Sequence, residues 1–186
     1  SSSSTGLIPN PTVTYTTANA TGSIAFTPVT DQSGTATITV TVEDGGLDGN
    51  LDTAGDNATF SRTFDVTVNA GNDAPTLNSL SNESISEDAS EQTRNLAGIT
   101  AGGGEFQPLR VTSTSSSTGL IPNPTVTYTT ANAAGSIAFT PVADQSGTAT
   151  ITVTVEDGGL DNNLSTAGDN ATFSRTFDVT VNAGND

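Results

Sequence analysis

The chain has 186 residues, with 20 Asp and Glu, 4 Arg and no Lys, His, Cys or Met, and its formal net charge is −16. This acidity excludes the basic surface that nucleic acids require and disfavours anionic membranes, and no apolar run approaches the roughly 20 residues that span a bilayer. Without Lys, His and Cys the chain lacks disulfides and most catalytic bases and nucleophiles, so we expect no enzyme activity.

A duplication organises the chain. Residues 1–73 and 114–186 align without a gap at an offset of 113, and a repeat of this length has the usual size of one domain. We expect 74–186 to form a complete repeat and 1–73 to form the C-terminal two-thirds of another, with its first strands missing. The parent chain or a neighbouring molecule would supply those strands, because an incomplete sheet exposes unpaired edges. The two copies differ only at Ser1/Thr114, Thr21/Ala134, Thr30/Ala143, Gly49/Asn162 and Asp52/Ser165.

Alternation of apolar and polar residues predicts β-strands in both copies, and no segment has helical periodicity. In chain order, the second copy shows this alternation in PLRVTST with Leu109 and Val111, in SIAFTPV with Ile137 and Phe139, and in the runs 148–156 and 172–182. Gly, Pro and Asn mark the turns between these runs. The pattern predicts an all-β fold of tandem Ig-like or cadherin-like antiparallel β-sandwich repeats, each with about seven or eight strands.

An acid-rich loop follows a long strand in each copy, and Val42–Asn57 contains five carboxylates. Because 148–156 and 172–182 run in opposite directions, we expect Glu156 and Asp157 at one end of the second repeat and Asp144 at the other. In the first copy the same polarity places Asp31, Asn72 and Asp73 beside the junction between repeats. Carboxylates gathered without lysine favour a hard divalent cation such as Ca²⁺, which takes six to eight oxygen ligands.

We therefore predict at least one Ca²⁺ at the junction between the repeats. Further ions would sit at other junctions, with Glu87 and Asp144 as ligands there, and Glu43 and Asp44 are the first-copy counterparts of Glu156 and Asp157. The alternative is a solvated loop, because Asp, Asn and Gly are also common turn formers. The ligands expected at the junction itself are Asp31, Asn72, Asp73, Glu105, Glu156 and Asp157.

The segments VTVEDGG, FDVTVNAGNDAPTL and SISEDASEQT resemble the cadherin-like repeats of very large bacterial surface proteins. That family binds calcium between successive domains. The resemblance matches Asp44 and Asp157 to a strand-end aspartate, Asn72 and Asp73 to the linker before Pro75, Glu87 to an opening glutamate, and Asp31 and Asp144 to the aspartate of a Leu-Asp-Arg-Glu element.

The chain also departs from the cadherin pattern at three places. Ala70 replaces a linker aspartate, AGGGE leaves Glu105 alone where the family has Asp-x-Asp, and Gln32-Ser33 replaces Arg-Glu. The resemblance therefore implies one ion at a junction rather than three.

These observations favour a structural or adhesive module at a bacterial cell surface or in the extracellular space. Its repeats would form a calcium-rigidified stalk or fibre, with neighbouring repeats of the same protein as partners. One alternative is a self-assembling filament or sheath subunit whose copies join by strand exchange. Another is an ice-binding surface formed by the threonine ranks at 35–41 and 148–154, although the twist of a sandwich sheet disfavours the flat array that ice requires.

Overall fold

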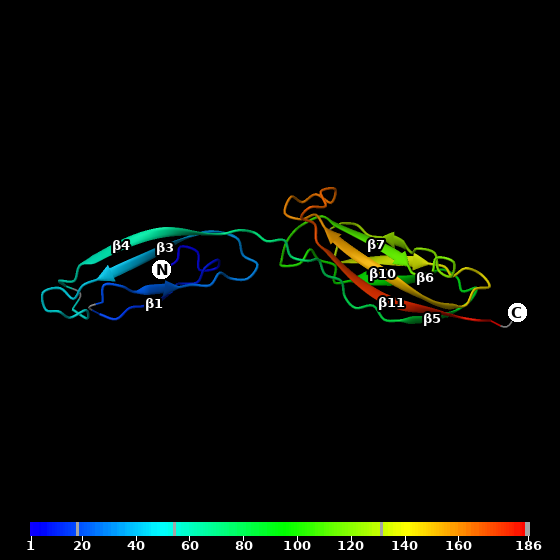
Figure 1. Cartoon of the computed structure of the whole chain (residues 1–186), viewed down its shortest axis with the longest axis horizontal. Helices are drawn as coiled ribbons and strands as arrows, with labels where there is room; N and C mark the ends of the chain where they lie inside the picture. The colour runs from blue at the N-terminus through cyan, green and yellow to red at the C-terminus, as the bar shows by residue number, and fades with distance from the viewer. Residues whose placement is uncertain (18, 54, 131, 185–186) are drawn as a thin grey trace. The chain divides into compact units, whose positions relative to one another are not determined.

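A computed structural model of the chain describes residues 1–17, 19–53, 55–130 and 132–184 (Figure 1). The described residues form β-strands and loops and contain no helix, which confirms the expected all-β class. It follows that this part of the chain holds no helix long and apolar enough to cross a membrane. The chain divides into two compact units, unit 1 at Ser1–Gly71 and unit 2 at Asn72–Asp186.

Unit 2 contains two sheets. One is four-stranded, in the order β5-β11-β10-β7, and the other is three-stranded, in the order β6-β9-β8 (Figure 1). All pairings are antiparallel except that of β11 with β5, which is parallel. The strands are β5 (Glu83–Ser86), β6 (Gln92–Ala97), β7 (Leu109–Ser115), β8 (Thr125–Thr127), β9 (Ala134–Phe139), β10 (Gly147–Asp157) and β11 (Thr172–Asn182).

The core of unit 2 follows the alternation of the sequence. Every second residue of β10 points inward, so that Ile151, Val153 and Val155 are fully buried, while the threonines between them are partly exposed. Phe177 and its neighbours on β11 extend the same layer, and Ile137 of β9 contributes to the core from the second sheet. Burial of each such side chain contributes about 1.5–3 kcal/mol, which makes the two-sheet contact the main source of stability.

Unit 1 contains two pairs of antiparallel strands. The strand β1 (Thr12–Thr14) pairs with β2 (Ser23–Ala25), and β3 (Gly34–Glu43) pairs with β4 (Thr59–Val68). Beside β3, Ser3 N–H donates to the Thr37 carbonyl at 3.0 Å and Thr39 N–H donates to the Ser1 carbonyl at 2.9 Å. The buried core is small and consists of Leu7, Ile8, Ala36 and Ile38.

Val42 and Val155 occupy the same place in the two copies, yet Val42 is 63% exposed and Val155 is 0% exposed. Val155→Ala should therefore lower the free energy of unfolding of unit 2 by about 2 kcal/mol, from lost transfer energy and the cavity left behind. Val42→Ala should change that of unit 1 by less than about 0.5 kcal/mol. Denaturant titrations separate the units, since each contains one of the two tyrosines. Tyr15→Phe leaves Tyr128 to report on unit 2, and Tyr128→Phe leaves Tyr15 to report on unit 1. Equal losses of unfolding free energy in Val155→Ala and Val42→Ala would contradict the difference in burial.

Candidate metal site

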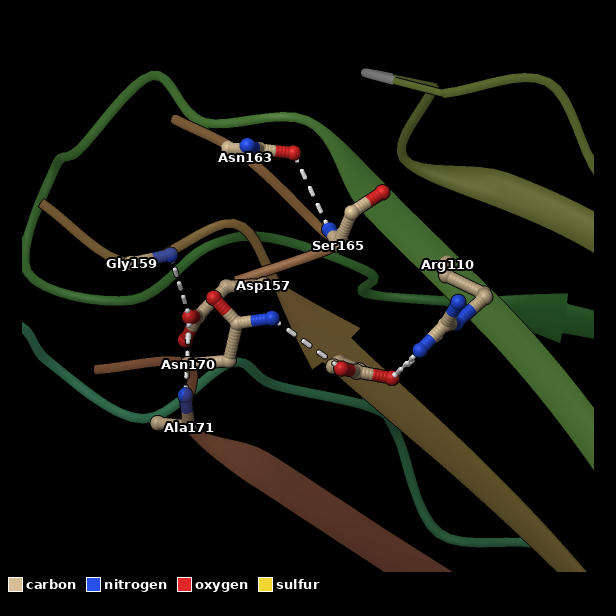
Figure 2. Close-up of polar contacts among 8 residues, drawn as sticks. Arg110, Asp157, Gly159, Asn163, Ser165, Asn170 and Ala171 are labelled. Atoms are coloured by element: carbon tan, nitrogen blue, oxygen red, sulfur yellow. Dashed lines mark hydrogen bonds and ion pairs between the residues drawn. The ribbon is translucent and has the colours of Figure 1, made fainter. Parts of the chain in front are cut away.

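The carboxylates of the acidic loop in unit 2 accept hydrogen bonds from the backbone of the loop itself. Asp157 ends β10, and its Oδ1 accepts from the N–H of Gly159 at 2.9 Å and from that of Ala171 at 2.9 Å (Figure 2). One side chain thus ties together the two ends of the loop. Such side-chain acceptors take the place of backbone partners in turns, which is why Asp and Asn are frequent there.

The same device recurs further along the loop. Asp169 Oδ2 accepts from Leu160 N–H at 2.8 Å, and Asp161 Oδ1 accepts from Asn163 N–H at 2.9 Å. Asn163 Oδ1 in turn accepts from Ser165 N–H at 3.0 Å (Figure 2). Several of the polar side chains that suggested metal ligation therefore already hold the loop in shape.

The loop of unit 1 repeats this arrangement. Asp44 Oδ1 accepts from the N–H groups of Gly46 and Ala58, each at 3.0 Å, and Asp56 Oδ2 accepts from Leu47 N–H at 2.7 Å. Gly46 has a positive φ of 61°, and a Cβ there would lie 2.5 Å from the carboxyl carbon of Asp56. Only glycine fits this position of the EDGG motif. The hydrogen bond from Ala58, and then that from Gly46, hold the pKa of Asp44 below its ordinary value.

Asp157 differs from the other carboxylates because it is fully buried. Its Oδ1 accepts a third hydrogen bond, from Asn72 Nδ2 at 3.1 Å, but its Oδ2 has no hydrogen-bond partner among the described residues. A buried carboxylate oxygen without a donor or a cation is energetically costly. Asp157 Oδ2 is therefore the atom in this site that most needs a partner.

Four further polar residues form a hydrogen-bonded chain beside Asp157. Asn72 Oδ1 accepts from Gln107 Nε2 at 2.8 Å, and Gln107 Nε2 also donates to Glu105 Oε2 at 3.0 Å. Glu105 Oε2 accepts from the N–H of Asp73 at 3.3 Å as well. Gln107 Oε1 is buried and has no partner in the part of the chain that the structure describes. We call Asn72, Asp73, Glu105, Gln107 and Asp157 the Asp157 cluster.

The Asp157 cluster contains four of the six ligands predicted for the junction: Asn72, Asp73, Glu105 and Asp157. Its donor set of carboxylates and carboxamides suits a hard cation. Within the described ranges, however, no group of three or more acidic side chains is placed so that it could hold a metal ion by itself. Any ion bound here would therefore depend on the two amide side chains as well as on the carboxylates.

Glu156 lies on the other face of β10, because neighbouring strand residues point to opposite sides. Its Oε2 accepts from Arg110 Nε at 3.0 Å and its Oε1 from Asn170 Nδ2 at 3.1 Å (Figure 2). Burial is the largest single influence on this carboxyl and favours the neutral form. The two hydrogen bonds and the Arg110 charge together outweigh it, so the pKa of Glu156 is lowered.

The other predicted ligands lie elsewhere. Asp31 and Asp144 are exposed residues with φ of 58°, in the turns that precede β3 and β10. Glu43 Oε1 accepts from Asn57 Nδ2 at 3.0 Å, like Glu156 with Asn170. Glu87 Oε1 accepts from Gly184 N–H at 2.5 Å, near the end of β11 that is remote from Asp157.

Sequence reasoning did not identify Gln107 or Asp169 as part of this site. Asn72 Nδ2 donates to the Asp169 carbonyl at 2.9 Å, which attaches the start of unit 2 to the acidic loop. For Gln107 the sequence offers no signal, because its contact with Asn72 joins residues that lie 35 positions apart in the chain.

No protein-family model matches the chain, and no curated protein matches it. Among solved structures it is similar to surface layer protein SbsC domains 1–6, with a TM-score of 0.41 and 16% identity, over 100% of this chain and 20% of that one. A structure of SbsC domains 4 and 5 gives a TM-score of 0.40 and 15% identity, over 97% and 69% of the two chains. The titin domains z1z2 in complex with telethonin give 0.39 and 14%, over 95% and 74%. At these values the assignment of an all-β fold rests on the strands themselves.

Glu156 should give unit 2 a pH-dependent stability. Its folded pKa lies below the ordinary glutamate value of about 4.3, so its contribution is complete above that pH and is lost as the pH falls through the lowered pKa. In calcium-free buffer and a Tyr15→Phe background, the free energy of unfolding should fall more steeply between about pH 5 and 3 than in Glu156→Gln. The same change in unit 1, Glu43→Gln, should leave the Tyr128 curve unaltered. Parallel curves for the parent and Glu156→Gln would show that the carboxylate does not stabilise unit 2.

Proposed function

We propose that this chain is part of a non-catalytic extracellular module at a bacterial cell surface, in which tandem β-sandwich repeats form a stalk or fibre stiffened by calcium. Two near-identical copies within 186 residues support a role in which length comes from repetition. The lack of Lys, His and Cys supports a role in spacing or attachment rather than in catalysis. The immediate partners are neighbouring repeats of the same protein.

The observation that carries the calcium proposal is the unpartnered, fully buried Oδ2 of Asp157. A cation beside this atom would supply the missing partner and offset the charge. The unpartnered Gln107 Oε1 is a second ligand in the same cluster. Asn72 and Glu105 already contact Asp157 or Gln107, so little rearrangement is needed to bring their oxygens to the same ion.

The carboxamides of Asn72 and Gln107 hold the Asp157 cluster together through hydrogen bonds. Their NH₂ groups donate to Asp157 and Glu105, which is the role that a cation would take over. A half-turn of the Asn72 carboxamide exchanges its nitrogen and oxygen and turns an acceptor toward the ion, while Gln107 Oε1 is already free to bind it. Side-chain oxygens of the Asp157 cluster, completed by water, then reach the six to eight ligands that Ca²⁺ takes.

A bound ion would restrain the segment that connects the units. Asn72 and Asp73 follow Gly71, the last residue of unit 1. Holding these two residues on the acidic loop removes backbone freedom where the chain could otherwise bend, and Asn72 already bonds to Asp157 and Asp169. Ligation by Asp31, Glu156, Glu87, Asp144, Glu43 and Asp44 stays a prediction; the second-copy counterparts of Asn72 and Asp73 are Asn185 and Asp186, which lie outside the described residues.

Asp157→Asn provides the test of calcium binding. It keeps an acceptor for Gly159 and Ala171 but removes the charge and the free oxygen, so calcium binding should be lost. Extracellular modules bind calcium at about 10⁻⁴–10⁻³ M, and a site of ~100 μM stabilises the folded state by about 2.7 kcal/mol at roughly 10 mM calcium. Melting of unit 2, read from Tyr128, should therefore shift upward with calcium in the parent chain and not in Asp157→Asn. Calorimetric titration should show the same loss of binding.

The matched control is Asp44→Asn, the same change at the corresponding residue of unit 1, which should preserve the calcium response of unit 2. Without calcium, Asp157→Asn should melt at the parent temperature or higher, because it removes a buried charge that lacks a full set of partners. Small-angle scattering should give a smaller maximum dimension in chelator than in calcium. If calcium changes neither the melting temperature of unit 2 nor the maximum dimension, the proposal is refuted. The acidic loops are then self-capped turns without a metal role.

A further inference from the structure

One face of unit 1 is apolar and uncovered, although the same residues in unit 2 are buried. Phe64 is 42% exposed and its counterpart Phe177 is 2% exposed, while Phe26 is 37% exposed and Phe139 is 3% exposed. Val42 is likewise more exposed than its counterpart Val155. The sequences of β3 and β4 are identical to those of β10 and β11 up to the strand ends, so local sequence cannot explain the difference. The difference must come from what packs on the strands.

In unit 2 the covering residues come from the segment 74–113, which has no counterpart in 1–73. β5 pairs with the free edge of β11, β7 pairs with the free edge of β10, and β6 pairs with β9. Leu96 and Ile99 from this segment are buried in the core of unit 2. Arg94 lies over the ring of Phe177, with its guanidinium carbon 5.5 Å from the ring centroid.

The start of unit 1 shows where such a segment would join. Ser3 N–H donates to Thr37 O, and Ser116 N–H donates to Thr150 O in the corresponding place of unit 2. Thr37 N–H likewise donates to Ser3 Oγ at 2.9 Å, and Thr150 N–H to Ser116 Oγ at 2.8 Å. Ser1–Ser3 therefore follow the path that the chain takes at and just after the end of β7. The β3 edge beyond them, from Val40 to Asp44, corresponds to the edge of β10 that β7 occupies.

We propose that the uncovered face of unit 1 binds a segment with the sequence of residues 74–113, in the register seen in unit 2. In that register the copy of Val111 pairs with Val42, the copy of Arg110 pairs with Glu43, and the copy of Ile85 pairs with Val68 in parallel. The added apolar residues cover Phe26 and Phe64. This strand pairing requires no calcium.

A second copy of the whole chain is a poorer occupant. Its own 74–113 segment already forms β5, β6 and β7 of unit 2, so donation to another molecule would require opening that sheet. A segment joined before Ser1 would have no such cost, because Ser1–Ser3 run along β3 toward the open edge. A segment joined to the same chain leaves a monomer, whereas a second copy as the occupant produces a dimer.

The experiment adds residues 74–113 before Ser1 of the full chain and follows amide hydrogen exchange by NMR. Thr39 N–H faces Ser1 O, so the next amides on the same edge of β3 are those of Thr41 and Glu43. Their exchange should slow by about 100-fold or more in the extended chain, because they become paired inside a sheet. The matched control carries the same extension with its copies of Ile85 and Val111 replaced by aspartate, and should leave both amides unprotected.

Unchanged exchange of Thr41 and Glu43 in the extended chain would overturn the proposal. So would a dimer of the unextended chain, measured by sedimentation, in which these two amides are already protected, because the occupant would then be a second copy. If the extended chain does not fold, a free peptide of residues 74–113 added to the full chain must slow the same two amides. Failure of the peptide to do so would also overturn the proposal.

Discussion

The long antiparallel pairing of β10 with β11 determines where the acidic loop of unit 2 begins and which way Glu156 and Asp157 point. Its register runs from Gly147 opposite Val181 to Glu156 opposite Thr172, and the acidic loop begins where the pairing ends. Because side chains alternate along a strand, the neighbours Glu156 and Asp157 point to opposite faces. One carboxylate meets Arg110 at the surface, and the other is buried beside Asn72 and Gln107. A shift of one residue in the register would exchange these environments.

Two nearly identical sequences in one chain separate local from tertiary effects. The acidic loops of units 1 and 2 form the same self-capped turns, so this structure is encoded within the loop itself. Burial of the strand residues behaves differently, since Phe64 and Phe177 share their strand neighbours and differ in exposure. The alternating pattern therefore specifies which face is apolar, and in unit 2 the segment 74–113 covers that face.

The sequence was sufficient to predict the all-β class, the long strands and the loops between them, because alternation is a local property that survives in the structure. It also indicated that Asn72, Asp73, Glu105 and Asp157 belong together, and they form one hydrogen-bonded cluster. It could not show that Asp44 and Asp169 would cap backbone amides, since a capping carboxylate and a metal ligand look alike in sequence. The contribution of Gln107 depends on contacts between segments far apart in the chain, which no local pattern reports.

The self-capped loops also bear on how the two copies have diverged. Two of the five differences between them, Gly49/Asn162 and Asp52/Ser165, fall in these loops. Gly49 and Asn162 both have a positive φ, a conformation that asparagine tolerates better than most residues. Asp52 and Ser165 each offer only a backbone N–H to the carboxamide of the preceding Asn50 or Asn163, and any residue except proline can provide that. The two differences in these loops thus lie at residues that contribute only their backbone. The aspartates whose side chains cap the turns are identical in both copies.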